Sequence, residues 1–240
     1  MSIKYHYDLV QGTEEWFRER LGKLTASEMK NIITPSKFEV VKGVKDGTHP
    51  YIYEIVAQRI TDFVEPHYEG FDMQRGKIEE VYARQIYSEN YAPASDCGFV
   101  TNDKWGFTIG YSPDALIGDE GLIEIKSRNQ KHQTKTIIEN VLPDEFSIQI
   151  QTALLITERK FCDFISYSNG MPMFVLTVLP NEEIQEAIIK AASEFEEKAK
   201  IAIEKYHANS ANFFKAERRE FSDLGISSSE EKNDNFIFGV

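Results

Sequence analysis

Two carboxylates and one lysine stand in the middle of the chain at a spacing that a β-hairpin would bring together. Residues 121–127 alternate in the manner of a strand, so Glu124 and Lys126 project to one face and the isoleucines beside them project into a core. Asp114 stands ten residues before Glu124, across a turn that begins and ends with glycine at 118–121. We expect the three charged side chains to converge at one point.

Such a point suits phosphodiester hydrolysis with a divalent metal ion. Carboxylate oxygens are hard ligands that hold Mg²⁺, which keeps several of its waters. The metal polarises a phosphate oxygen and acidifies a bound water. A lysine beside the carboxylates orients that water and offsets charge that develops in the transition state. We therefore expect Mg²⁺, with Mn²⁺ as a substitute, at Asp114 and Glu124.

The bare motif is also compatible with an exposed charge pair after an ordinary turn. The chain contains a second Pro-Asp pair, Pro143-Asp144, which is followed by Glu158-Arg159-Lys160. There an arginine, rather than an apolar residue, separates the glutamate from the lysine, and the segment lies where a helix is expected to give way to a strand. The residues around the first motif are therefore needed to distinguish a metal site from an exposed charge pair.

Two further polar residues belong to that neighbourhood. Glu80 lies in an expected helix over 71–87 and could add a carboxylate to the metal site, directly or through water. A solvated charged face is the alternative. Gln149 lies in an expected helix over 143–157, where a water or a DNA phosphate could satisfy its amide. An exposed glutamine is the alternative there.

The order of predicted elements indicates a mixed α/β fold with a central sheet flanked by helices. The strands are expected at 98–102, 107–111, 121–127, 161–167 and 173–179, the first three as an antiparallel meander. Further helices are expected at 13–21, 27–33, 50–64, 131–141 and 181–207. Thr25 to Glu28 matches a capping box, and Tyr53, Val56, Ala57 and Ile60 are expected on the apolar face of their helix.

Composition favours one domain over residues 1–226, followed by a polar, flexible tail over 227–240. The amino terminus has no apolar stretch after a basic start, no run is long enough to span a bilayer, and two cysteines form no disulfide framework. We expect a cytoplasmic protein without a membrane partner. The net charge of −12 argues against nucleic acid, although residues 1–50 carry a slight positive excess.

Five blocks of residues, in order, resemble the λ-type phage alkaline exonucleases, also called YqaJ-like viral recombinase nucleases. The resemblance runs from about Gln11 to Leu179. The blocks are Gln11-Gly12-x-x-x-Trp16-x-x-x-Arg20-Leu21-Gly22-x-x-Thr25-Ala26-Ser27, Gly76-x-x-x-Glu80, Ser112-Pro113-Asp114, Glu124-Ile125-Lys126 and Gln149-x-Gln151. The ordered series is far more specific than any single block.

This resemblance implies a PD-(D/E)xK, restriction-endonuclease-like core and assigns roles within it. Asp114, Glu124 and the backbone carbonyl of Ile125 would bind Mg²⁺, and Lys126 would serve the attacking water. Glu80 and Gln149 would support the site.

The resemblance also implies a pocket for the 5′-phosphate of the cut strand, formed by Arg20, Ser27 and Ser112. A guanidinium suits this role because it binds phosphate oxygens in a bidentate manner, and an ordinary helix-end arginine is the alternative. His132 stands where the λ enzyme has a second pocket arginine, and Arg128 or Lys131 could substitute for it. Strict dependence on a 5′-phosphate therefore stays open.

The implied activity is 5′-to-3′ digestion of double-stranded DNA, which leaves single-stranded DNA for phage-type recombination. A ring-shaped homotrimer and a single-strand-annealing protein as partner are implied with it. The competing functions are a structure- or site-specific endonuclease on the same fold, a non-catalytic DNA-end-binding module and a protein-interaction scaffold.

Overall fold

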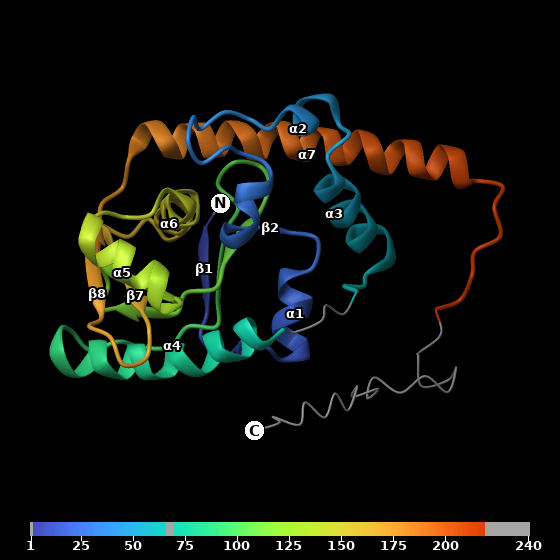
Figure 1. The fold of residues 1–240 in the computed structure, drawn as a ribbon. Helices are drawn as coiled ribbons and strands as arrows, with labels where there is room; N and C mark the ends of the chain where they lie inside the picture. Colours follow the sequence, from blue (N-terminus) through green and yellow to red (C-terminus); the bar gives the residue numbers. More distant parts are fainter. Residues whose placement is uncertain (1, 66–69, 219–240) are drawn as a thin grey trace, which may run out of the picture. The chain divides into compact units, whose positions relative to one another are not determined.

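The computed structural model describes residues 2–65 and 70–218 (Figure 1). The chain divides into two units, Met1–Lys205 and Tyr206–Val240. The strands and most of the helical residues belong to the first unit, and the described part of the second consists of the end of the last helix and an irregular stretch. The boundary expected at residue 226, and the tail expected beyond it, lie outside the described residues.

The strands form two four-stranded sheets, and each sheet contains parallel and antiparallel pairs. The order is β1-β3-β4-β2 in the first sheet and β5-β6-β7-β8 in the second. Their bounds are β1 Ile3–His6, β2 Leu24–Thr25, β3 Phe99–Asn102, β4 Ile109–Tyr111, β5 Ala115–Ile117, β6 Gly121–Ser127, β7 Phe161–Tyr167 and β8 Phe174–Val178. The α/β class with mixed strand pairing is confirmed, although the strands divide into two sheets where one was predicted.

The expected three-stranded meander was wrong in its pairing. β3 and β4 pair antiparallel, but β6 pairs with the short strand β5, which the sequence pattern did not predict. Pro113 lies between β4 and β5, and a proline has no N–H with which to continue a ladder. The chain changes sheet at this point, and Asp114 follows directly.

Helices cover both sides of the strands, with α7 along one side and α4 along the other in Figure 1. Their bounds are α1 Glu14–Arg20, the 3₁₀ helix η1 Ala26–Asn31, α2 Lys42–Asp46, α3 Pro50–Thr61, α4 Phe71–Asn90, α5 Gln130–Glu139, α6 Asp144–Thr157 and α7 Glu182–Ser210. Among the described residues, no helix combines the length and the apolar character needed to cross a bilayer.

Buried side chains gather in two clusters, and β6 contributes to both. Leu122 packs in the larger cluster, with apolar side chains of α3, α6 and α7. Ile123 and Ile125 pack in the smaller cluster, with Ala83 and Tyr87 of α4. Side chains of a strand alternate between its faces, so Glu124 and Lys126 lie on the face of Leu122.

Side chains cap the starts of α1 and α7, but not the start of η1. Thr13 caps α1 by accepting a hydrogen bond from the backbone N–H of Trp16, and Asn181 caps α7 in the same way. The capping box expected at Thr25 does not form, because Thr25 belongs to β2 and pairs with Gly110. A 3₁₀ helix follows there instead of an α-helix.

The apolar face expected for α3 was right at Val56, which is buried, and at Ile60, which packs against the larger cluster, but wrong at the other two positions. Tyr53 and Ala57 are exposed, and the buried positions are Tyr51, Ile52, Ile55 and Val56. Both sets have helical spacing and contain a tyrosine and a valine, but the buried set has two isoleucines where the expected set has one isoleucine and an alanine. The Tyr51 ring packs against Phe195 of α7, with ring centroids 5.5 Å apart.

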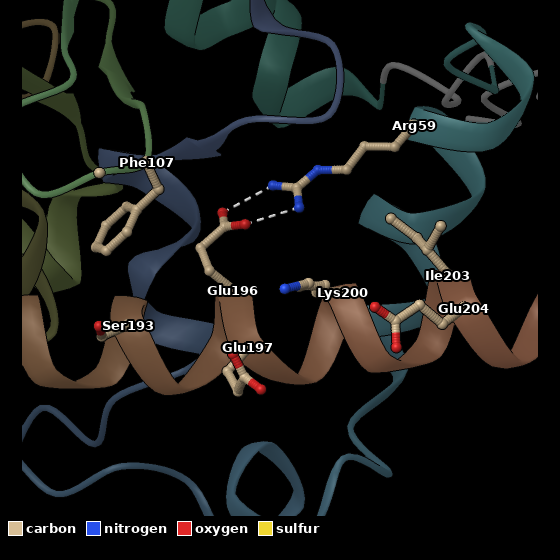
Figure 2. Close-up of a pocket in the computed structure, with 9 residues that line it drawn as sticks. Arg59, Phe107, Ser193, Glu196, Glu197, Lys200, Ile203 and Glu204 are labelled. Atoms are coloured by element: carbon tan, nitrogen blue, oxygen red, sulfur yellow. Dashed lines mark hydrogen bonds and ion pairs between the residues drawn. The ribbon is translucent and has the colours of Figure 1, made fainter.

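A bidentate ion pair joins α3 to α7 beside a hollow of about 590 Å³ (Figure 2). The two terminal nitrogens of Arg59 each lie 2.7 Å from an oxygen of Glu196, and Nε donates to the carbonyl of Gly22, also at 2.7 Å. Gly22 has a left-handed φ of 65°, and a Cβ there would lie 2.8 Å from the side chain of Arg59. Charged residues of α7 line much of this hollow, and none of the predicted site residues does.

Candidate active site

The hairpin of β5 and β6 brings Asp114 beside the strand that carries Glu124. Asp114 precedes β5, and its Oδ2 accepts a hydrogen bond from the backbone N–H of Ile125 at 2.5 Å. This N–H lies beyond the last paired residues of the hairpin, Ala115 and Ile123. The hydrogen bonding between the two strands therefore continues through the Asp114 side chain. This bond fixes the carboxylate next to the middle of β6.

Glu124 is the centre of a hydrogen-bond network inside the protein. Its side chain is 2% exposed. Oε1 accepts from Nζ of Lys126 at 2.7 Å and from Nε2 of Gln149 at 2.5 Å, while Oε2 accepts from the hydroxyl of Tyr111 at 2.8 Å. Residues from β4, β6 and α6 thus meet at one carboxylate. Gln149 contacts a protein carboxylate here, instead of the water or DNA phosphate considered for it.

The charges at this point perturb one another strongly. Burial, and then the carboxylates of Glu124 and Glu80, raise the pKa of Asp114 well above its usual range. Burial also raises the pKa of Glu80, and the Glu124 carboxylate adds to the increase while Arg84 opposes it. For Lys126, burial lowers the pKa, but Glu124 and Asp114 more than offset it, so the net pKa is raised. The charges of Asp114, Glu124, Glu80 and Lys126 are therefore close enough to act on one another.

Two adjacent glutamates of α4 have different surroundings. Glu79 is buried, and its oxygens accept from the hydroxyl of Ser127 at 2.5 Å and from the backbone of Asn169 at 3.4 Å. Glu80 is the one whose charge acts on Glu124 and Asp114. The helix thus directs one carboxylate to the end of β6 and the other to the charged cluster.

The donor set fits a hard divalent cation in its chemistry. Mg²⁺ is held in proteins by one or two carboxylates together with several waters, and a cation between Asp114 and Glu124 would relieve the repulsion that raises the pKa of Asp114. Within the described residues, no three or more histidine, cysteine, aspartate or glutamate side chains are arranged as a ready-made metal cage. The carbonyl of Ile125 stays a predicted ligand.

Arg20 contacts Ser112, which lies two residues before Asp114. Nη1 of Arg20 donates to the Ser112 hydroxyl oxygen at 3.0 Å, and the indole N–H of Trp16 is shared between the same oxygen at 3.0 Å and the carbonyl of Gly98 at 3.1 Å. The Arg20 guanidinium lies 4.4 Å from the Trp16 ring centroid. Arginine and tryptophan are donors only. The Ser112 oxygen therefore accepts twice, and its own proton is left to donate to a further acceptor.

The remaining predicted phosphate contacts are less closely grouped. Ser27 lies in η1, with its hydroxyl 3.4 Å from that of Thr25. Arg128 follows β6, and its Nη1 donates to Glu145 at 2.5 Å. Lys131 and His132 are exposed in the first turn of α5.

Three residues at the site were not singled out as functional in the sequence. Tyr111 and Trp16 hold Glu124 and Ser112 as described above, and Arg84 is within 3.5 Å of the Asp114 carbonyl and pairs with Asp96. An aromatic residue in an apolar strand is usually part of the core, so the sequence pattern around Tyr111 did not indicate a functional role. Its place three residues before Asp114 was the available clue.

Comparison with known proteins places the whole arrangement in a known family. The family model described as YqaJ-like viral recombinase domain matches residues 15–160. A crystal structure of an alkaline exonuclease (LHK-Exo) from Laribacter hongkongensis is 31% identical and covers 84% of this chain and 100% of its own, with a TM-score of 0.72. LHK-Exo in complex with dAMP matches with the same identity and coverage and a TM-score of 0.73.

A phage-related exonuclease from Haemophilus somnus is more distant. It is 12% identical, covers 77% of this chain and 96% of its own, and has a TM-score of 0.55, which is a likeness of fold. No curated protein sequence matches the chain.

Proposed function

The chain belongs to the YqaJ-like viral recombinase domain family, and from that premise we propose that it is a Mg²⁺-dependent exonuclease that digests double-stranded DNA from an end. The convergence of Asp114, Glu124 and Lys126 beside β6 supports this most directly. Mononucleotides are the expected product, in keeping with the dAMP bound to LHK-Exo.

In this proposal Asp114, Glu124 and the carbonyl of Ile125 hold the metal, and Glu80 supports it through water. Mg²⁺, or Mn²⁺ in its place, supplies polarisation of the scissile phosphate and a more acidic water. Lys126 turns its ammonium from Glu124 toward the attacking water and offsets negative charge in the transition state. Gln149 and Tyr111 fix the Glu124 carboxylate, so that the oxygen lone pair left for the metal keeps one direction.

The contact of Arg20 with Ser112 supports a 5′-to-3′ direction. The Arg20 guanidinium and the Ser112 hydroxyl can both donate hydrogen bonds. A pocket formed by these two donors suits a terminal phosphate. Ser112 is two residues before Asp114, so a 5′-phosphate held there would lie close to the metal ligands. Digestion from the 5′ end would leave single-stranded DNA for recombination.

One assay tests the activity against its competitors. Linear duplex labelled at its ends and covalently closed circular duplex are each incubated with the protein, in Mg²⁺ and in EDTA. Mg²⁺-dependent release of mononucleotides from the linear DNA alone is the expected result. Cutting of the circle would instead identify an endonuclease, and binding without cleavage a DNA-end-binding module.

The assembly and the partner are part of the same proposal. We expect a homotrimer, which light scattering of the full chain would detect as three times the 27.6 kDa chain mass. We also expect a single-strand-annealing protein to receive the strand that remains. A monomer at all concentrations would contradict the trimer and leave the nuclease proposal standing.

A further inference from the structure

Arg128 lies on the side of β6 that carries the catalytic candidates. It follows Lys126 by two residues, and its backbone N–H donates to Tyr167 at 2.7 Å, so the strand direction persists as far as Arg128. Its guanidinium is 5.0 Å from the centroid of the Phe146 ring, and Nζ of Lys126 is 5.6 Å from the same centroid. Two cations therefore flank one aromatic ring of α6.

The guanidinium of Arg128 has an unfilled hydrogen bond. Its Nε is buried and lacks a partner, and among the described residues no other side-chain nitrogen or oxygen is left in that condition. A buried donor without an acceptor is unfavourable. The position thus suits an anionic group with several acceptor oxygens.

Glu145 occupies the accessible side of this guanidinium. One of its oxygens accepts from Nη1 at 2.5 Å. The Glu145 side chain is 59% exposed, whereas that of Arg128 is 13% exposed. The exposed Glu145 carboxylate can return to water, whereas the largely buried Arg128 guanidinium needs an anion in its place, so Glu145 can be exchanged for another anion.

We propose that Glu145 takes the place of a DNA backbone phosphate on Arg128 while the protein is free of DNA. A phosphate has the same anionic acceptor oxygens and can also bind the guanidinium through two parallel hydrogen bonds. Such a pair would use Nε together with a terminal nitrogen, which fills the missing bond. The inference rests on the proposed function, because it requires DNA beside β6.

Glu145→Gln and Asp144→Asn in the full chain give a matched comparison. Both acids lie in the first turn of α6 and both are exposed, but it is Glu145 that pairs with Arg128. Each substitution removes one negative charge. Binding of a 5′-phosphorylated duplex oligonucleotide is measured by fluorescence anisotropy in EDTA, at several salt concentrations, so that no turnover is needed.

We expect Glu145→Gln to tighten binding by about three-fold, because at least the energy of a weak ion pair no longer has to be given up, and Asp144→Asn to change it much less. Arg128→Ala should weaken binding and reduce the slope of log affinity against log salt by about 1. In the Arg128→Ala background, Glu145→Gln should bring no gain. If Glu145→Gln does not fold, Glu145→Ser replaces it with the same expectation.

Equal tightening by the two substitutions would overturn the inference, because the effect would then be one of overall charge. The inference would also be overturned if Glu145→Gln still tightened DNA binding in the Arg128→Ala background. Either result leaves the nuclease proposal intact if the unsubstituted protein binds DNA. If the unsubstituted protein does not bind DNA, both this inference and the nuclease proposal are contradicted.

Discussion

The buried hydroxyl of Tyr111 donates a hydrogen bond to Oε2 of Glu124 at 2.8 Å. Lys126 and Gln149 occupy the other oxygen of this carboxylate. With three donors on two oxygens, Glu124 is held in one orientation. Residues that orient a metal ligand affect metal binding without touching the metal.

Tyr111→Phe should therefore raise the Mg²⁺ concentration for half-maximal cleavage by about ten-fold, the scale seen when a ligand loses its supporting group. Tyr87→Phe is the matched control, because the Tyr87 hydroxyl also donates to a carboxylate, that of Asp163, at 2.5 Å. The metal dependence of both variants is measured by titrating Mg²⁺ in the cleavage assay. An unchanged requirement in Tyr111→Phe would contradict the orienting role.

Lys126→Ala should lower the rate of cleavage by about 100- to 1000-fold, the range for loss of one group that stabilises transition-state charge. Its affinity for Mg²⁺ should not fall, because the lost hydrogen bond to Glu124 is offset by removal of a positive charge beside the cation site. Calorimetric titration measures the affinity for Mg²⁺, and turnover measurements give the rate of cleavage. Lys135→Ala, at an exposed position in α5, is the control. A large loss of metal affinity at an unchanged maximal rate would refute the assignment.

Arg20→Ala should selectively slow cleavage of duplexes that carry a 5′-phosphate. Rates on 5′-phosphorylated and 5′-hydroxyl duplexes should become equal in this variant, because the guanidinium that contacts Ser112 is gone. Arg18→Ala tests an exposed arginine of the same helix, which pairs with Glu14. If Arg20→Ala slows both substrates by the same factor, Arg20 is a general DNA contact or a structural residue.

Arg159→Ala should lower the free energy of unfolding by about 3 kcal/mol, because a charged donor to the carbonyl of buried Gly121 and to that of Gly118 in the turn is lost. Nη1 of Arg159 donates to Gly118 at 2.7 Å and to Gly121 at 2.5 Å, on either side of the β5–β6 turn. Urea denaturation measures the change, with Lys160→Ala as the exposed neighbour. Equal stability of the two variants would show that Arg159 does not secure the hairpin.

Much of the fold followed from the sequence because long periodic segments dominate it. The strand expected at 161–167 is β7 within the same bounds, and the helix expected to begin after Asn181 is α7. The strands β2 and β5, of two and three residues, gave too few residues for a period to be recognised, and β1 was not predicted either. The exchange of sheets at Pro113 depends on tertiary pairing, which no local pattern contains.

The charged part of the candidate site was also predictable, because strand alternation alone puts Glu124 and Lys126 on one face. The partners of these residues were harder to foresee. Tyr111 has the sequence signature of a core aromatic, and Arg159 lies within a segment that reads as a chance charge pair. Their roles arise from contacts across β4, β6 and β7 that only the folded chain defines.

The role of Asp114 is tested most directly by replacing it with alanine and following digestion of a 5′-phosphorylated linear duplex in Mg²⁺. The variant should lose cleavage by at least about 1000-fold while DNA binding in EDTA persists, because a ligand carboxylate and a negative charge facing phosphate are both removed. An Asp114→Ala protein that digests the duplex at a near-normal, Mg²⁺-dependent rate would contradict the proposed active site.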